Sequence, residues 1–309
     1  MIAAGTGLEL AGAVWVGVLF LFVACFFAAD LFTLFGFLFH SCLPNIRTSA
    51  ALAAMLLSLI ALVQGSRDPV VRTEEVVLRG LPKELDGKTA VQLTDVHLCP
   101  FTRFSGAERL INQVNGLRPD ILFMTGDIFD DLGTAARFLP VLKRLSAPLG
   151  VWAVTGNHEF YAGLEESKEF YTEAGFHTLT EGRAEAAPGL WIAGVDDLTT
   201  LRRRTGDGAE TVDKALDSPP IGAEIFLSHS PLFVKEAAKR GAGLVVSGHT
   251  HAGQIWPFGY VVRLFYPYLA GRYSVGGTTL IVSRGTGTWG PPMRLFRRSE
   301  IVRIVLRRG

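Results

Sequence analysis

The chain has 309 residues, enough for one large domain or two smaller ones, and 49% of them are hydrophobic, with a positive mean hydropathy. This apolar content is high for a soluble enzyme, so its position along the chain decides the class of protein. The net charge of +1 produces no strong field over the whole molecule, and we therefore expect no nucleic-acid partner. Nothing in the sequence indicates an oligomeric state.

The first two predicted elements are long apolar helices. No residue between Glu9 and Asp30 is charged, and a second uncharged stretch lies between Arg47 and Arg67. About 20 apolar residues suffice to cross a bilayer as a helix, so residues 1–66 are predicted to form a membrane anchor of two transmembrane helices in a hairpin. A cleaved signal peptide is disfavoured because no basic region precedes the apolar run. Stretches this long and uncharged are also rarely buried helices of soluble proteins.

We expect a multi-pass protein of the cell membrane, and the charges around these two stretches indicate which side of the membrane the following domain occupies. The connector between the spans carries Arg47, whereas the side of the following domain carries several basic residues, and the positive-inside tendency then favours a cytoplasmic catalytic domain. Asp30 interrupts the first apolar region, and we expect it to lie at the membrane interface or to pair within the helical bundle. The basic residues on the domain side are Arg67, Arg72, Arg79 and Lys83.

Residues 70–309 are predicted to form a globular domain in which short strands and helices alternate. This alternation indicates a layered α/β domain with two sheets packed face to face and helices outside. The β-prone runs are Glu75–Leu78, Ala90–Leu93, Ile121–Met124, Val151–Val154, Leu190–Val195, Glu224–Leu227, Leu244–Val246, Thr279–Val282 and Ile301–Leu306. The helix-like stretches are Ala107–Gly116, Ala135–Leu145, Glu165–Ala174 and Leu232–Lys239.

Polar groups recur where several of these β-prone runs end. Loops at the carboxyl ends of strands line the ligand crevice of α/β sheets, so groups far apart in sequence can converge there. A single Asp-x-His or Gly-His is often only a cap or a turn. Together, however, buried histidines and carboxylates are costly without a common partner, and metal ions supply one. The segments are Thr94-Asp95-Val96-His97, Gly126-Asp127, Gly156-Asn157-His158-Glu159, Ser228-His229-Ser230 and Ser247-Gly248-His249-Thr250-His251.

The types of donor atom restrict which metal ions could bind and which reaction they could support. Carboxylate and amide oxygens mixed with imidazoles suit Mn, Fe, Zn or Mg, and the three cysteines, of which only Cys99 lies near these segments, fit no metal spacing or disulfide framework. Two divalent ions about 3.5–4 Å apart need a bridging carboxylate and clamp both the attacking and the leaving oxygen of a phosphoryl displacement. Asp127 is the expected bridge.

The blocks DVH at 95–97, GDIFD at 126–130, GNHE at 156–159, SHS at 228–230 and GHTH at 248–251 resemble the calcineurin-like metallophosphoesterases, over roughly residues 72–306. The resemblance implies the two-sheet sandwich of that family and two metal ions with a bridging hydroxide as nucleophile. It implies that one ion is held by Asp95, His97, Asp127 and His251. It implies that the other is held by Asp127, Asn157, His229 and His249. His158 would protonate or polarise the leaving group, and Asp130 would orient it.

A narrower resemblance concerns the substrate. The segments HTHAGQIWPFG at 249–259 and VSRGTGTWGPPMR at 282–294, with the N-terminal spans, resemble bacterial membrane-associated phosphodiesterases and transmembrane proteins carrying a metallophosphoesterase domain. Some of these hydrolyse UDP-2,3-diacylglucosamine in lipid A biosynthesis, although they often carry more than two spans. We therefore expect a phosphodiester or pyrophosphate in a lipid-linked substrate. The alternatives are a broad phosphodiesterase acting on soluble substrates and a non-catalytic membrane protein that keeps the fold, against which His158 and Asp130 argue.

Three further segments have two interpretations each. Aromatic and basic residues between Ile255 and Tyr273 fit either a loop at the bilayer interface or acyl-chain groove, or an ordinary cover over the sheet. The basic C-terminal stretch from Arg294 to Arg308 either attracts anionic headgroups or is a solvated edge strand. The run 202–204 of three arginines either grips a substrate phosphate or is a solvated loop.

Overall fold

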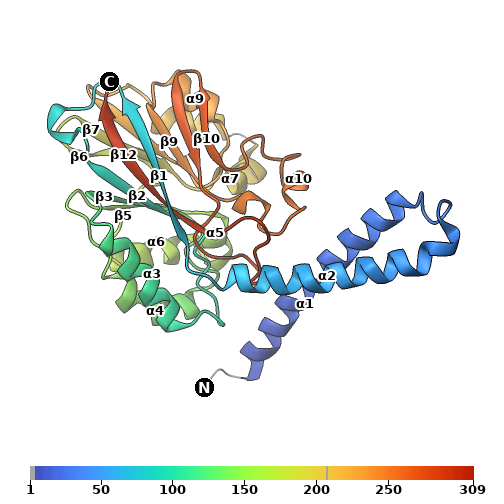
Figure 1. The fold of residues 1–309 in the computed structure, drawn as a ribbon. Coiled ribbons are helices and arrows are strands. Elements are labelled where there is room, and N and C mark those ends of the chain that lie inside the picture. The colour runs from blue at the N-terminus through green and yellow to red at the C-terminus, as the bar shows by residue number, and fades with distance from the viewer. Residues whose placement is uncertain (1–3, 207) are drawn as a thin grey trace.

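The computed structural model describes residues 4–206 and 208–309, so residues 1–3 of the predicted anchor and residue 207 of the predicted domain lie outside the described residues. Figure 1 shows a body of sheets and helices with a helical hairpin that projects from one end of it. The end of the last strand lies at the other end of the body.

The hairpin consists of α1 (Ala4–Phe32) and α2 (Leu43–Gly65), joined through a 3₁₀ turn at His40–Cys42. Two described helices are long and apolar enough to cross a membrane, and these two elements provide them. Most of their large apolar side chains face outward rather than into the body. Asp30 pairs with Arg47 across the hairpin at 3.3 Å, which confirms the expected pairing within the bundle.

The first sheet contains strands whose side chains are buried on both faces. The runs of Val, Leu, Ile and Phe in its central strands explain this, because a sheet covered on both sides needs continuous apolar sequence rather than alternation. The first neighbouring pair is parallel, the second is antiparallel and the remaining three are parallel. In order across the sheet, the strands are β1 (Val70–Leu78), β12 (Glu300–Arg308), β2 (Thr89–Leu93), β3 (Ile121–Thr125), β4 (Val151–Val154) and β5 (His177–Thr178).

The second sheet has four parallel neighbours in its centre and an antiparallel strand at each edge. The strands are, in order, β10 (Gly271–Val275), β11 (Thr278–Val282), β9 (Leu244–Ser247), β8 (Ala223–Leu227), β7 (Leu190–Val195) and β6 (Glu181–Ala187). Each edge strand is joined to its neighbour by a short turn.

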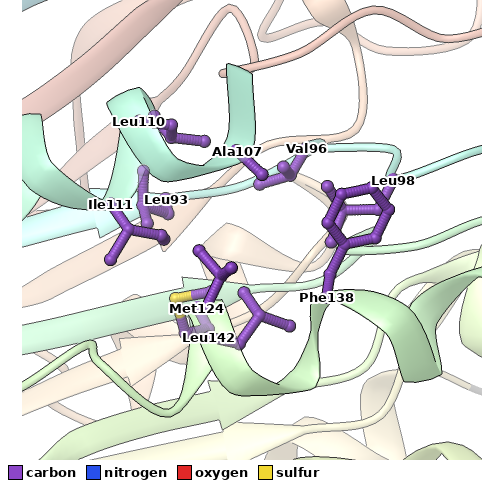
Figure 2. Close-up of a pocket in the computed structure, with 10 residues that line it drawn as sticks. Leu93, Val96, Leu98, Ala107, Leu110, Ile111, Met124, Phe138 and Leu142 are labelled. Carbon is purple, nitrogen blue, oxygen red and sulfur yellow. The ribbon is translucent and has the colours of Figure 1, made fainter. Parts of the chain in front are cut away.

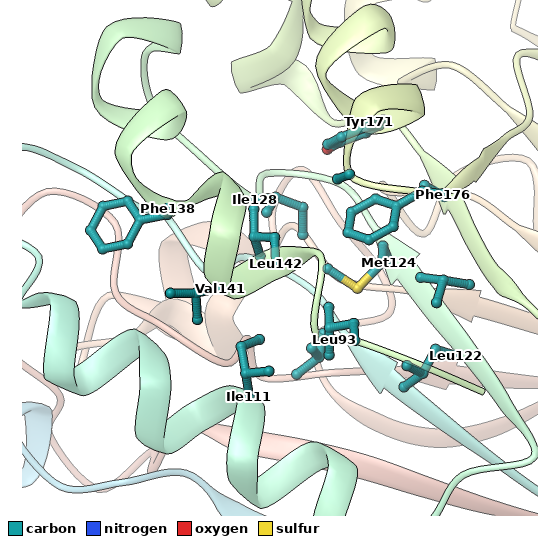
Figure 3. Packing of buried hydrophobic residues seen from close by; sticks show 14 of the residues in the cluster. Leu93, Ile111, Leu122, Met124, Ile128, Phe138, Val141, Leu142, Tyr171 and Phe176 are labelled. Carbon is teal, nitrogen blue, oxygen red and sulfur yellow. The ribbon is translucent and has the colours of Figure 1, made fainter.

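Three apolar clusters hold the layers together. One lies between the two sheets and includes Phe123 from β3 and Ile225 from β8. A second packs the outer face of the first sheet against helices, as Figure 3 shows for Met124, Phe138 and Tyr171. A third covers the outer face of the second sheet. The helices of the body are α3 (Phe104–Gly116), α4 (Leu132–Leu142), α5 (Asn157–Ala162), α6 (Leu164–Glu173), α7 (Leu198–Thr205), α8 (Ala209–Ala215), α9 (Val234–Lys239) and α10 (Gly259–Val262).

This arrangement confirms the predicted two-sheet α/β fold with flanking helices. A small pocket within the second cluster, between α3 and α4, has a volume of about 10 Å³ and only apolar lining (Figure 2). A space of this size holds at most one water molecule, so the pocket is a packing defect rather than a binding site.

Two expectations about the strands were wrong or incomplete. β12 is not an edge strand, because it lies between β1 and β2, and its alternate side chains pack in the core. The sequence also gave no indication of the two edge strands β6 and β10. β6 is rich in Glu, Ala and Gly, which are poor strand formers, and β10 has only Tyr and Val as strong strand formers; pairing with β7 and β11 overrides the weak local preference.

Candidate metal centre

The predicted ligands follow the carboxyl ends of inner strands in both sheets. Asp95 and His97 follow β2, and Asp127 follows β3. The remaining four lie at the start of α5 after β4, after β8 and after β9, and are Asn157, His229, His249 and His251. Because these strands run parallel within each sheet, their carboxyl ends bring the side chains to one place.

The first group joins Asp95, His97 and His251. The Nε2 atoms of His97 and His251 lie 3.1 Å apart, and the Nε2 atom of His251 lies 3.3 Å from Asp95 Oδ1. All three side chains are buried, and their donor atoms are close enough to share one ion. Two imidazole nitrogens that face each other in this way suit a common cation.

The second group joins Asp127, His229 and His249. Asp127 Oδ2 lies 3.1 Å from His229 Nε2, which in turn lies 3.1 Å from His249 Nδ1. The same Asp127 oxygen lies 3.8 Å from His97 Nε2, so Asp127 stands between the two groups. A carboxylate in this position is within reach of both groups.

Asn157 and His158 come from the N-terminus of α5. The backbone N–H of His158 donates to Asp127 Oδ1 at 2.9 Å, which fixes this helix end beside the second group. The Oδ1 atom of Asn157 is buried and has no hydrogen-bond partner. A buried amide oxygen without a partner is costly, and a cation at this position would satisfy it.

Asp130 contacts two histidines through one oxygen. Its Oδ1 atom lies 3.0 Å from His158 Nδ1 and 2.7 Å from His97 Nδ1. A carboxylate that holds the distal nitrogen of a metal-ligating histidine fixes both the tautomer and the ring orientation. Asp130 is thus placed to orient a ligand as well as the proposed acid, a second contact that sequence alone did not predict.

The backbone at the centre is strained. Five candidate ligands have left-handed φ values between 49° and 71°, a region that favours glycine. Such conformations persist where the surroundings enforce them, and they concentrate at functional sites. The five are Asp95, His97, Asp127, His249 and His251.

Glu159 holds the centre from behind, and the sequence did not assign it a role. It is fully buried, and its two carboxylate oxygens accept hydrogen bonds from the backbone N–H groups of Asp127, Ile128 and Gly156 at 2.7–2.9 Å. It therefore ties the loop after β3 to the loop after β4. Its position in the block GNHE was the available signal.

Two further residues reach the ligands from the segment 255–308. The Tyr266 hydroxyl lies 2.6 Å from His249 Nε2 and 3.3 Å from Thr199 Oγ1. The guanidinium of Arg294 lies 3.3 Å from His251 Nδ1, and it donates to the carbonyls of Gly285 and Gly287. Arg294 is completely buried, which rules out both interpretations of it as a solvated or lipid-facing charge.

The protonation of the centre follows from burial, from hydrogen bonds and from neighbouring charges. Burial opposes ionisation of Asp130, but hydrogen bonds from His158 and His97 outweigh it and lower the pKa of Asp130 to about 2. Burial, aided by the charge of His229, lowers the pKa of His249 to about 4. Burial lowers the pKa of Arg294 to about 10. His249 is therefore neutral near pH 7, as a metal ligand must be.

The remaining polar candidates lie outside the centre. Among the described residues, Cys99 belongs to none of the groups that could hold an ion; it is buried, with its Sγ atom 3.3 Å from Thr102 Oγ1. The three arginines at 202–204 form the exposed last turn of α7, and the guanidinium of Arg204 lies over the ring of Phe160. They line no part of the ligand cluster.

Comparison with known proteins agrees with this geometry. Residues 88–253 match the family described as calcineurin-like phosphoesterase. A protein of Bos taurus named "Transmembrane protein with metallophosphoesterase domain" is 34% identical over 273 residues, covering 83% of this chain and 61% of that protein. Its counterpart in Danio rerio is also 34% identical, with 84% and 62% covered. The chain thus spans about three fifths of the length of these two relatives. An "Uncharacterized metallophosphoesterase" of Aquifex aeolicus is 37% identical, with 74% and 87% covered.

Proposed function

The chain belongs to the calcineurin-like phosphoesterase family, and on that premise we propose that it is a membrane-anchored, metal-dependent hydrolase of a phosphodiester or pyrophosphate bond. One observation carries the proposal above all. Two groups of buried or half-buried donors from both sheets meet at Asp127; within them imidazole nitrogens face each other, and beside them the buried amide oxygen of Asn157 has no partner. A cation in each group would satisfy these donors together.

We assign one ion to Asp95, His97, Asp127 and His251, and the other to Asp127, Asn157, His229 and His249. These oxygen and imidazole donors suit Mn, Fe, Zn or Mg. When bound, two such ions lower the pKa of water and stabilise the charge that develops on a phosphoryl group. The buried carboxylates Asp95 and Asp127 offset part of the positive charge.

His158 is proposed as the general acid. Its Nδ1 atom is engaged by Asp130, which leaves Nε2 to donate a proton to the leaving oxygen. The ring lies edge-on to His97 with 4.7 Å between the ring centroids, so the proton is delivered beside the first group. Holding the imidazole in one tautomer is the contribution of Asp130.

We further propose that α1 and α2 are transmembrane helices and that residues 1–66 anchor the domain at 70–309. The length and apolar character of the two helices support this, as do the names of the Bos taurus and Danio rerio relatives. The Asp30–Arg47 ion pair reduces the cost of placing both charges in or near the bilayer. The excess of basic residues after α2 favours a multi-pass arrangement with the body on the cytoplasmic side.

The proposed substrate is a lipid-linked phosphodiester or pyrophosphate such as UDP-2,3-diacylglucosamine, a precursor of lipid A. A test compares the metal-reconstituted full chain on this compound in mixed micelles and on a soluble aryl phosphodiester. We expect metal-dependent turnover that Asp127→Asn abolishes and Asp131→Asn leaves intact. Asp131 is a suitable control because it only caps α4, a role that Asn also fills.

The outcomes separate the candidate functions. Undiminished turnover by Asp127→Asn would refute the metal mechanism. Turnover of the aryl diester alone would favour a broad phosphodiesterase acting on soluble substrates. Absence of turnover on every phosphoester, with the ions bound, would favour a non-catalytic binding protein.

A further inference from the structure

An apolar surface lies on the body beside the hairpin. Leu264 and Phe265, just after α10, are 79% and 69% exposed, and Val261 within α10 is also exposed. We call this the α10 surface and define it as Phe258, Val261, Leu264, Phe265 and Phe296. Soluble domains rarely leave several large apolar side chains together in water, so such a surface indicates a partner.

The α10 surface is continuous with the hairpin. The rings of Phe258 and Phe20 of α1 pack edge to face, with 5.9 Å between their centroids. Nearby, Leu21 of α1 and Ala61 of α2 form a buried cluster with residues of the segments 255 and 293–295. The backbone N–H of Phe296 donates to the side chain of Gln64 at 2.9 Å. The body is thus packed on the hairpin at this surface rather than held only by the connection after α2.

The depth in a bilayer of the contact between α2 and the body follows from helix geometry. The backbone carbonyl of Ala61 accepts a hydrogen bond from the N–H of Arg294 at 2.9 Å. From Leu43, where α2 begins, to Ala61, the helix rises about 27 Å at ~1.5 Å per residue. A bilayer has a hydrocarbon core about 30 Å thick. If α2 crosses from the far edge of that core, the contact with the body lies at or inside its near edge.

Charge complements this position. No acidic residue occurs between Glu236 and Glu300, whereas exposed arginines lie next to residues of the α10 surface along the chain. Apolar side chains beside basic ones suit an interface with anionic lipid, since the former enter the acyl boundary and the latter stay at the headgroups. The flanking arginines are Arg263, Arg297 and Arg298.

We propose that the α10 surface is a third membrane contact, in addition to the two helices, and that it holds the mouth of the metal centre at the level of the lipid headgroups. Tyr266, the next residue after this surface, reaches His249. On the other side, the exposed ring of Trp289 lies 6.3 Å from that of His158. The inference rests on the proposed anchoring, and it specifies the substrate class as amphiphiles whose phosphate lies at headgroup depth.

The test measures depth in the full-length chain, reconstituted in vesicles of equal parts phosphatidylcholine and phosphatidylglycerol. Single cysteines carry an environment-sensitive fluorophore in a Cys25→Ala/Cys42→Ala background, with Cys99 buried. Leu264→Cys probes the α10 surface. Val23→Cys, on the exposed face of α1, reports whether the hairpin inserts. Ile221→Cys is the matched control, because Ile221 is a 98% exposed apolar residue before β8, at the strand end opposite the centre.

Lipids spin-labelled near the headgroup and deep in the acyl chain act as quenchers. We expect the shallow label to remove most of the fluorescence at Leu264→Cys, the deep label to do so at Val23→Cys, and neither to affect Ile221→Cys. If Val23→Cys is quenched while Leu264→Cys behaves like Ile221→Cys, the inference is overturned and the anchor stands. If Val23→Cys is not quenched either, the anchoring in the proposed function is wrong. Because Leu264 is exposed, its replacement removes no core packing.

Discussion

The metal centre and the hairpin with its α10 surface depart in opposite directions from the usual partition of residues between core and surface. The centre buries carboxylates and imidazoles, whereas the hairpin and the α10 surface expose Phe, Leu and Val. Each departure is costly in water and within the chain alone. The comparison teaches that each region calls for a different partner from outside the chain, and the partners we propose are divalent cations for the centre and a bilayer for the hairpin and its neighbouring surface.

The two regions also meet. Arg294 contacts His251 through its side chain and Ala61 of α2 through its backbone N–H, so a single buried residue touches both. The hairpin therefore contacts the residue that packs behind His251, and changes in one region can be measured against the other.

The largest expected effect comes from removing a proposed ligand of the centre. His229→Ala should lower kcat/KM about a thousandfold, because it removes a donor next to Asp127. This factor corresponds to a loss of several kcal/mol of transition-state stabilisation. The measurement is steady-state hydrolysis of an aryl phosphodiester at saturating metal. His177→Ala is the control, since this exposed histidine lies at β5, outside the cluster. Equal activity of the two variants would break the assignment.

The next effect is on folding stability. Glu159→Ala leaves three buried backbone N–H groups without an acceptor, and we expect it to lower the free energy of unfolding by about 3 kcal/mol or more. Denaturant titration in detergent gives this value. Glu165→Ala, which removes a carboxylate exposed on α6, should stay within about 0.5 kcal/mol of wild type. A small effect at Glu159 would show that the loops after β3 and β4 are held by other contacts.

A smaller loss is expected at the residue that orients two histidines. Asp130→Asn should reduce kcat/KM by about 10–100-fold, the usual cost of losing a carboxylate behind a metal ligand. It should also weaken metal binding, measured by competition with a chelating dye, because His97 loses its partner. A variant that lost activity but kept wild-type metal affinity would restrict the role of Asp130 to His158.

The smallest effect concerns the apolar region. A side chain at Gly17 would collide with Met293 and Pro291, whereas one at Gly12, five residues earlier in α1, would meet nothing. Gly17→Ile should therefore weaken docking of the hairpin on the body by about 1–3 kcal/mol, and Gly12→Ile should not. Faster amide hydrogen exchange in the segment 291–296 of Gly17→Ile alone would report this. Equal exchange in both variants would mean that the hairpin does not pack as described.

The residues whose type is dictated by chemistry were accessible from sequence. Asp127 and His249 each follow a glycine after an apolar run, and this local pattern can be recognised without knowledge of the fold. The central strands were predictable for a related reason, since β4 and β7 are short apolar runs with no helical alternative.

Residues that act through distant contacts were not accessible. Arg294 is one of several arginines in a basic stretch, and only the three-dimensional structure shows that it is surrounded by carbonyl groups. Tyr266 appeared as one aromatic residue among many, and its contact with His249 depends on the path of the chain through α10. Such roles depend on tertiary geometry rather than on local pattern.

The central claim is that Asp127 joins two ions into one centre, and metal stoichiometry tests it most directly. The purified full chain is loaded with Mn or Zn, dialysed, and analysed by mass spectrometry of the metal, beside Asp127→Asn and the control Asp131→Asn. We expect two ions per chain in wild type and in Asp131→Asn, and fewer than two in Asp127→Asn. Two tightly bound ions in Asp127→Asn, or none in wild type, would contradict it.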